Sequence, residues 1–177
     1  MLLGTLGVPF EVEAPDVDES LPTGELPRDS VLRLAQSKAE RVATAHPEAW
    51  ALGSDTLVAI EARPLGKPLD AEDARRMLGA LSGRRHEVWT GIALARQGQA
   101  TLARAEVAQV AFRRLSAEEI AAYVSTGEPL DKAGAYAIQG GARAFVSSLE
   151  GDESTVIGLP VAATRALLVA CGFTELA

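Results

Sequence analysis

The chain has 177 residues, of which 47% are hydrophobic, and it carries a formal net charge of −7 and a single cysteine. This length and composition suit one compact domain, or two small lobes that share a sheet around a real core. The negative charge argues against binding to a nucleic-acid backbone, which needs clustered positive charge. One cysteine excludes a disulfide framework or a cysteine-based zinc site within the chain. Because the sequence has neither an apolar run near the ~20 residues of a membrane span nor a signal-peptide pattern, we expect a cytoplasmic protein.

The first third of the chain predicts a strand, an acidic loop and a helix. Residues Val8 to Glu13 alternate apolar and acidic side chains, which is typical of a half-exposed strand. Acidic residues and prolines dominate residues 14–27 and indicate a loop. A helix is expected from Asp29 or Ser30, either of which could cap it. Its apolar face consists of residues that recur at helical spacing: Val31, Leu34, Ala35, Ala39 and Val42.

The stretch from Trp50 to Ile60 predicts a buried strand that is apolar at both ends and polar at its centre, Ser54-Asp55-Thr56. A buried aspartate without partners would be strongly destabilising or would take up a proton. We therefore expect cations, a metal ion or hydrogen-bond donors around Asp55, and we interpret these three residues as the reaction centre. The basic loop from Arg63 to Pro68 follows at once and could bring Lys67 back to Asp55. On spacing alone, Lys38 reads as a lysine whose stem covers apolar surface.

The rest of the chain alternates helices and strands. Asp70 is expected to cap a helix over 71–81 that Ser82-Gly83 ends. Strands over 85–95 and 101–112, joined by a turn at 97–99, predict an antiparallel hairpin. A capping box at residues 116–119 opens the next helix. A short strand over 144–149 and a last helix with Pro160 in its first turn complete an α/β fold with a mixed sheet.

The glycine-rich stretch from Gly127 to Gly141 is the second unusual segment. It has no clean period and suits close approach of a ligand to the backbone, although a plain surface connection is the alternative. Within it, Asp131 and Lys132 could form an ion pair that fixes the loop, or could contact a substrate directly. The basic residues 84–86 after the second helix read either as solvated charge at a strand edge or as a contact to phosphate or a partner subunit.

Five motifs appear in order along the chain, and together they resemble the Maf family of nucleoside triphosphate pyrophosphatases from about Leu3 to Phe173. The motifs are Gly53-Ser54-Asp55-Thr56, Leu65-Gly66-Lys67-Pro68, Leu81 to Gly91, Asp131 to Gly140, and Val156-Ile157-Gly158-Leu159-Pro160. The resemblance implies one domain over residues 1–177. It also implies the fold shared with inosine-triphosphatase relatives, an elongated mixed sheet with flanking helices and two lobes around a cleft.

The resemblance further implies hydrolysis of a nucleoside triphosphate to a monophosphate and pyrophosphate, aided by a divalent cation such as Mg²⁺ or Mn²⁺. Asp55 matches the general base proposed for the family, while Glu19, Lys38 and Lys67 match the other polar residues of its cleft. Glu19 can share a hard cation with Asp55. Lys38 and Lys67 can neutralise phosphate oxygens and keep Asp55 ionised.

Two positions bear on the nucleobase. Thr56 and Gln139 match positions that separate the dTTP- and UTP-preferring branch from the branch that prefers 7-methyl-GTP, in which a glutamate replaces the glutamine. An amide donates and accepts, and so complements the acceptor–donor–acceptor edge of uracil or thymine. The sequence therefore favours dTTP, UTP or modified pyrimidine triphosphates as substrates over the purines of inosine-triphosphatase relatives.

One feature departs from the family pattern. The family opens with a strand and a Ser-x-Ser-Pro-Arg-Arg loop, whereas this chain starts at Met1 within the helix that follows, so the serine and both arginines have no counterpart in it. Either the natural chain starts earlier than Met1, or this protein lacks part of the phosphate clamp. For the second case the alternative function is a catalytically impaired, nucleotide-binding regulator of cell division, since several members are linked to septum formation. Family habit also suggests a homodimer.

Overall fold

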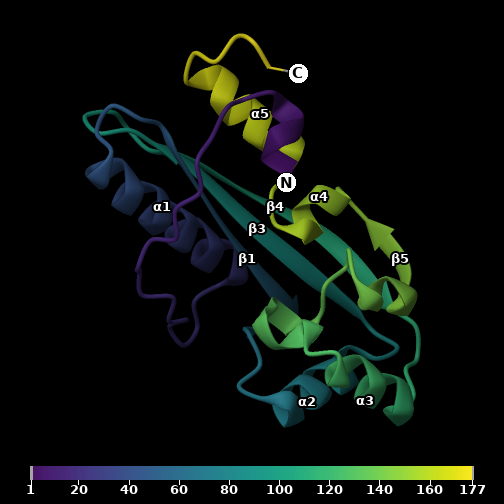
Figure 1. Ribbon diagram of the computed structural model, residues 1–177. Helices are drawn as coiled ribbons and strands as arrows, with labels where there is room; N and C mark the ends of the chain where they lie inside the picture. Colours follow the sequence, from purple (N-terminus) through teal and green to yellow (C-terminus); the bar gives the residue numbers. More distant parts are fainter. Residues whose placement is uncertain (1, 177) are drawn as a thin grey trace. The chain divides into compact units, whose positions relative to one another are not determined.

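The protein is described by a computed structural model that covers residues 2–176 (Figure 1). Five strands form one sheet in the order β2-β1-β3-β4-β5, and helices pack against it, which confirms the predicted α/β class. The strands are β1 (Ala51–Ile60), β2 (Arg63–Leu65), β3 (Arg85–Ala95), β4 (Leu102–Phe112) and β5 (Val146–Glu150). The α-helices are α1 (Pro27–Ala45), α2 (Ala71–Leu81), α3 (Ala117–Ser125), α4 (Glu153–Ile157) and α5 (Val161–Ala170). The 3₁₀ helices are η1 (Leu2–Leu6), η2 (Glu128–Asp131), η3 (Ala133–Ala135) and η4 (Gly141–Phe145).

The chain divides into two compact units, and β1, β3 and β4 contribute residues to both. Unit 1 comprises Met1–Asp55, Thr90–Glu106 and Gly158–Ala177, and unit 2 comprises Thr56–Trp89 and Val107–Ile157. The expectation of a single domain over residues 1–177 stays a prediction. Among the residues that the structure describes, no helix is both long and apolar enough to cross a bilayer.

Unit 1 is built on the contact of α1 with the sheet. Small side chains make this interface, and they are the buried alanines Ala35, Ala39, Ala43, Ala51, Ala93 and Ala95. The helix backbone comes so near β3 that a Cβ on Gly91 would stand 2.2 Å from the carbonyl oxygen of Val31. A second cluster joins η1 to α5 through Leu6, Leu94 and Leu168, and Figure 1 shows the purple η1 beside the yellow α5.

The start of α1 differs from the prediction. The helix begins at Pro27 with Leu26 at its N-cap and no side-chain cap, so the expected caps Asp29 and Ser30 are wrong. Proline suits the first helical position because its missing N–H would have no helical partner there. The Ser30 hydroxyl instead donates to Glu25, at 2.7 Å. The expected apolar face is confirmed, with four of its residues buried and Val42 half-buried.

Two further predictions about strands are wrong. Val8 to Glu13 is not part of the sheet, although its side chains alternate; Phe10 is 39% and Val12 is 69% exposed. Alternation needs only an extended chain, whereas a strand also needs a backbone partner, and Pro9 has no N–H to offer. Residues 63–65, expected as a loop, form β2 and pair antiparallel with Val58–Ile60 of β1. The turn between them holds Glu61 and Ala62 at positive φ, a hairpin geometry that the sequence did not signal with glycine or asparagine.

Unit 2 has an aromatic core beneath α2 and α3, which lie side by side (Figure 1). The rings of Phe112, Tyr136, Phe145 and Tyr123 meet edge to face, the arrangement that aromatic pairs prefer. Several local predictions are confirmed here. Asp70 caps α2 by accepting from the backbone N–H groups of residues 72 and 73, and the capping box at the start of α3 is present.

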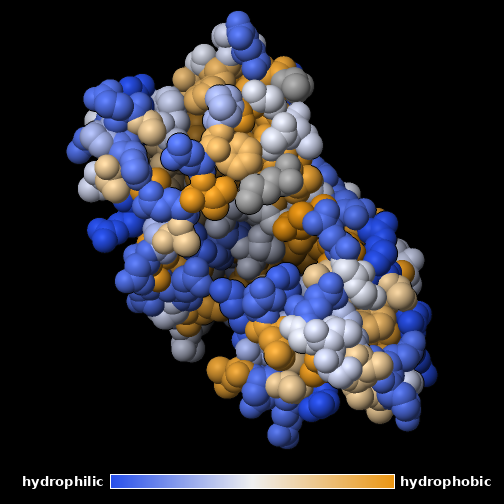
Figure 2. Space-filling model, in the orientation of Figure 1, coloured by the Kyte–Doolittle hydropathy of each residue, from blue (hydrophilic) through white to orange (hydrophobic). Residues whose placement is uncertain are grey.

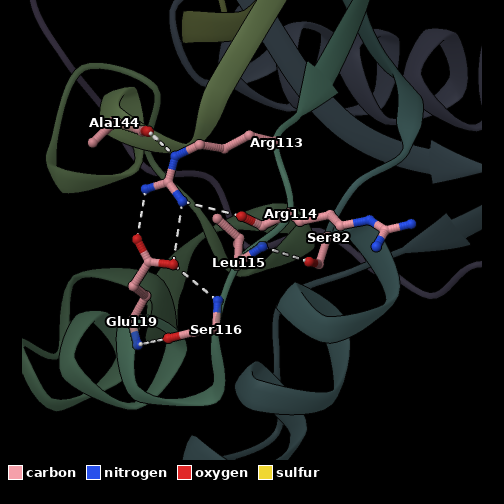
Figure 3. Close-up of polar contacts among 7 residues, drawn as sticks. All are labelled: Ser82, Arg113, Arg114, Leu115, Ser116, Glu119 and Ala144. Carbon is pink, nitrogen blue, oxygen red and sulfur yellow. Dashed lines mark hydrogen bonds and ion pairs between the residues drawn. The ribbon is translucent and has the colours of Figure 1, made fainter.

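One arginine ties three elements of unit 2 together (Figure 3). Arg113, just after β4, donates to the carbonyl oxygen of Ala144 at 2.9 Å and to the Glu119 carboxylate at 2.7 Å. Glu119 also completes the capping box of α3. The backbone N–H of Leu115 donates to the Ser82 hydroxyl at 2.8 Å, which fixes the end of α2 as well. None of the residues of this corner is a predicted site residue.

The last part of the chain departs from the prediction in detail. The short helix α4 was not expected, and β5 covers residues 146–150 in place of 144–149. Pro160 is the N-cap of α5 and not a residue of its first turn. Cys171, at the C-cap of α5, is half-buried.

Candidate active site

The periodicities of a strand and a helix bring Lys38 and Asp55 together in unit 1. Alternate residues of a strand face the same side, so Ala51, Gly53 and Asp55 share one face of β1. Ala51 packs with Ala35 of α1, which shows that this face is covered by the helix. Lys38 lies one helical turn beyond Ala35 on the same side of α1. The ammonium of Lys38 therefore reaches the carboxylate of Asp55.

Lys38 bridges two carboxylates. Its Nζ donates to Oδ1 of Asp55 at 2.6 Å and lies 2.7 Å from Oε1 of Glu19. The side chain of Asp55 is 13% exposed and that of Lys38 19%, whereas Glu19 is 47% exposed. The interpretation of Lys38 as a lysine that merely covers apolar surface is therefore wrong. Spacing could not reveal this pairing, because both partners are distant in sequence.

The charges of this cluster are compensated in part. Burial would lower the pKa of Lys38, but hydrogen bonds to Asp55 and Glu19 outweigh burial and raise that pKa above its ordinary value. The lysine is thus a permanent cation at neutral pH. Two carboxylates and one ammonium leave the cluster with a residual negative charge, which favours a further cation.

Ser54, the first residue of the predicted reaction centre, has a structural role. Its hydroxyl makes hydrogen bonds with the carbonyl oxygens of Gly91, at 3.1 Å, and Gly158, at 2.7 Å. These contacts tie β1 to β3 and to the turn before α5. Asp55 is consequently held on a strand that is fixed from its other side.

The sequence did not predict the contact between Arg33 and Glu25, which lies in the same loop as Glu19. Arg33 of α1 binds the Glu25 carboxylate through two nitrogens, at 2.9 and 2.8 Å, and donates to the carbonyl oxygen of Ser20 at 3.0 Å. The arginine therefore holds the loop that carries Glu19. The only signal in the sequence is an acidic loop followed by an arginine early in a helix, a pattern too common to be read as a contact.

The remaining predicted residues, Thr56, Lys67 and Gln139, belong to unit 2. Thr56 is half-buried on β1, whereas Lys67 and Gln139 are exposed. Their two loops are joined, because the N–H of Gly134 donates to the carbonyl oxygen of Gly66 at 3.0 Å. Only glycine fits there, since its φ is +67° and a Cβ would stand 2.8 Å from the Val58 side chain. The expected approach of Lys67 to Asp55 stays a prediction.

The ion pair expected within the glycine-rich loop is present. Nζ of Lys132 lies 2.8 Å from Oδ1 of Asp131. The hydrogen bond from Lys132, with the charges of Lys132 and Lys67, holds the pKa of Asp131 below its ordinary value. Two lysines thus lie close to one carboxylate at the surface of unit 2. A direct substrate contact by this pair stays a prediction.

His86 is not the solvated residue at a strand edge that the sequence suggested. It is 2% exposed, and its Nε2 lies 2.9 Å from the hydroxyl of Tyr136. Burial lowers the pKa of His86 to about 4, and its Nδ1 has no partner among the described residues. Arg84 and Arg85 do remain exposed, in ion pairs with Glu61 and Glu150.

A cavity of about 720 Å³ in unit 1 lies apart from these charges. Apolar side chains dominate its lining, among them Val8, Phe10, Trp50, Leu94 and Leu168. On the visible face of the molecule, hydrophobic side chains (orange) gather between the positions of α1 and α5 (Figure 2). None of Glu19, Lys38 and Asp55 lines this cavity, so its apolar wall does not contribute to the charged cluster.

Comparison with known proteins decides the family. The profile of the Maf family, described as "Maf-like protein", matches residues 1–171. The chain belongs to the Maf family. This Maf protein is 53% identical to the dTTP/UTP pyrophosphatase of Anaeromyxobacter dehalogenans (strain 2CP-C) over 175 residues, which cover 97% of this chain and 88% of that relative. It is 52% identical to the enzyme of the same name from Sphingopyxis alaskensis, with 97% and 90% covered, and 50% identical to that of Myxococcus xanthus, with 97% and 86% covered.

Proposed function

We propose that this Maf protein hydrolyses dTTP and UTP to the nucleoside monophosphate and pyrophosphate. The observation that carries the proposal is the cluster of Glu19, Lys38 and Asp55, which joins a helix, a loop and a strand in a chain about half identical to dTTP/UTP pyrophosphatases. A charged cluster of this kind on a rigid strand has no evident structural purpose, because burying ion pairs adds little to stability.

The reaction needs a water oxygen to bond to the α-phosphorus while the bond to the bridging oxygen of the β-phosphate breaks. Asp55 is the group that orients this water and takes its proton. The pyrophosphate leaves with the electron pair of the broken bond. Lys38, which stays charged, offsets the negative charge near the attacking water, and Lys67 binds phosphate oxygens.

A divalent cation suits the cluster. Among residues 2–176 no group of three or more histidine, cysteine or acidic side chains is placed to hold a metal ion. Glu19 and Asp55 nevertheless bring two hard oxygen donors to one ammonium, and Mg²⁺ commonly uses one or two carboxylates together with water and substrate phosphates. We therefore propose Glu19 and Asp55 as the ligands of Mg²⁺ or Mn²⁺. When bound, the ion supplies charge neutralisation and lowers the pKa of a coordinated water.

Nucleobase selection is assigned to Gln139 and Thr56. The amide of Gln139 is exposed and can donate to and accept from a pyrimidine edge. Thr56, whose side chain carries a hydroxyl, directly follows the proposed base Asp55 in strand β1. A glutamate at 139 would accept only, and would suit the two donors of a guanine.

The proposal is tested by measuring pyrophosphate release from dTTP, UTP, CTP, ATP, GTP, ITP and 7-methyl-GTP, with Mg²⁺ or Mn²⁺ and after chelation. We expect dTTP and UTP to be preferred, and turnover to require the metal. Asp55→Asn should lower kcat by roughly 10²–10⁴-fold while the fold survives. Asp16→Asn, an exposed aspartate in the loop before α1, is the matched control and should turn over normally.

Retained turnover in Asp55→Asn would refute the role of Asp55. Should the wild-type chain be stabilised against heat by nucleotides without releasing pyrophosphate, the alternative of a nucleotide-binding regulator would replace the enzyme. A link to septum formation, a homodimer and a cytoplasmic location stay predictions.

A further inference from the structure

Besides the contact of Glu19 with Lys38, a second ion pair, between Glu25 and Arg33, holds the loop before α1 to that helix. The Glu25 carboxylate accepts from Nε and Nη2 of Arg33, and its Oε2 also accepts from the Ser30 hydroxyl at 2.7 Å. Such a two-pronged pair fixes orientation as well as distance, because the guanidinium is planar. The side chains are half-buried, 36% exposed for Arg33 and 19% for Glu25.

The same arginine reaches the residue next to Glu19. Its Nη2 donates to the carbonyl oxygen of Ser20 at 3.0 Å, and the N–H of Ser20 donates to the Asp18 carboxylate at 2.9 Å. Both backbone polar groups of Ser20, the residue after Glu19, are thereby engaged, and Asp18 before it contributes its side chain. From this fixed position Glu19 meets Lys38 at 2.7 Å, although its own side chain is about half exposed.

We infer that Arg33 is a positioning residue, which acts through Glu25 and Ser20 to hold the Glu19 carboxylate beside Lys38 and Asp55. The inference rests on the proposed function for its effect on catalysis. The hydrogen bond to Glu25 foremost, and the charges of Glu25, Asp18 and Asp55, raise the pKa of Arg33 above its ordinary value, so the arginine stays charged. Without the Arg33–Glu25 ion pair and the Arg33–Ser20 hydrogen bond, together called the clamp, the loop keeps fewer contacts with α1. The half-exposed Glu19 carboxylate then spends more of its time in solvent.

The test uses Arg33→Gln, Arg33→Lys, Glu25→Gln and the control Arg28→Gln. Arg28 lies on the same helix, is exposed and contacts only its neighbour Asp29, at 3.4 Å, among the contacts described for it. We expect kcat/KM for dTTP to fall on the order of tenfold in Arg33→Gln and Glu25→Gln, and not in the control. Lysine keeps the positive charge but cannot bind the Glu25 carboxylate through two nitrogens as the guanidinium does, so Arg33→Lys should be impaired as well. Full activity of Arg33→Lys would overturn the inference, because charge alone would then suffice.

A double-mutant cycle separates positioning from general stabilisation. If Arg33 acts through Glu19, Arg33→Gln should cause no further loss in a Glu19→Gln background. Losses that multiply across the two substitutions would show that Arg33 acts independently of Glu19, and would overturn the inference.

Hydrogen exchange provides a readout that does not depend on turnover. Backbone amides of residues 18–25 should exchange several-fold faster in Arg33→Gln than in wild type or Arg28→Gln. Unchanged exchange would refute the clamp even if the chain hydrolyses dTTP. Conversely, a wild-type chain that hydrolyses no triphosphate would refute the proposed function, while faster exchange in Arg33→Gln would still support the clamp.

Discussion

The carbonyl oxygen of Ala35 lies so near Gly53 that a Cβ on residue 53 would stand 2.3 Å from it. That Cβ would also stand 2.7 Å from the backbone nitrogen of Ala39. Helix α1 thus rests directly on the backbone of β1, two residues before Asp55. This spacing lets the ammonium of Lys38 reach the carboxylate of Asp55.

We predict that Gly53→Ala destabilises the protein and reduces turnover together. The methyl group meets backbone atoms that cannot rotate away, so α1 must shift, at a cost of about 1–3 kcal/mol. The shift also moves Lys38 from Asp55. Urea unfolding and dTTP turnover measure the two effects. Gly79→Ala is the control, since a Cβ there meets nothing within 4 Å on a helix, and it should be neutral or stabilising. Wild-type stability in Gly53→Ala would contradict the close packing.

Lys38→Met should remove the cation that two carboxylates share. Lys38 is one of three lysines in the chain, and its Nζ donates to Asp55 at 2.6 Å. We expect kcat/KM to fall by roughly 10²–10³-fold, the range seen when a preorganised electrostatic group is lost. Stability should fall by on the order of 2 kcal/mol, because a mostly buried carboxylate loses one ion-pair partner. Arg104→Met, at an exposed position of unit 1, should change neither quantity. Equal turnover in both variants would exclude a catalytic role for Lys38.

The buried histidine should make stability depend on pH. His86 has a pKa of about 4 in the folded chain and 6.5 when unfolded, so between these values only the unfolded state takes up the proton. The contribution of neutral, buried His86 to the free energy of unfolding is therefore fully present above pH 6.5. It decreases as the pH falls from 6.5 towards 4. We expect a loss of about 2 kcal/mol by pH 5 relative to pH 7.5.

Urea unfolding of two variants isolates the contribution of His86 to the pH dependence of stability. His86→Phe fits the aromatic core but cannot titrate, so its stability should depend less on pH between 5 and 7.5 than that of wild type. Gln97→Ala, which replaces an exposed and uncharged side chain, should keep the wild-type slope. Identical slopes in wild type and His86→Phe would show that folding does not lower the pKa of His86.

Gln139→Glu should move base preference from pyrimidines towards 7-methyl-GTP. The added charge cannot donate to a pyrimidine acceptor, and a misplaced charged hydrogen bond changes affinity by roughly 10–100-fold. The measurement is the ratio of kcat/KM for UTP to that for 7-methyl-GTP. Gln99→Glu, in an exposed turn, should leave the ratio unchanged. An unaltered ratio in Gln139→Glu would remove Gln139 from base selection.

The sequence by itself determined those features whose causes lie within a few residues. Asp70 caps α2, Glu119 completes the capping box of α3, and β3 spans residues 85–95 as predicted, because capping groups and alternation act locally. The five motifs that appear in order between Gly53 and Pro160 also indicated the family without any geometry.

Only the tertiary structure decided the contacts between distant segments. Val8 to Glu13 has the alternation of a strand but no partner strand in the sheet. His86 follows two arginines at the end of a helix, a position typical of the surface, but it is buried and contacts the hydroxyl of Tyr136. The pairing of Lys38 with Asp55, 17 residues away, depends on how closely α1 approaches β1. Local propensity carries no information about such approaches, because packing of small residues such as Gly53 against another backbone sets them.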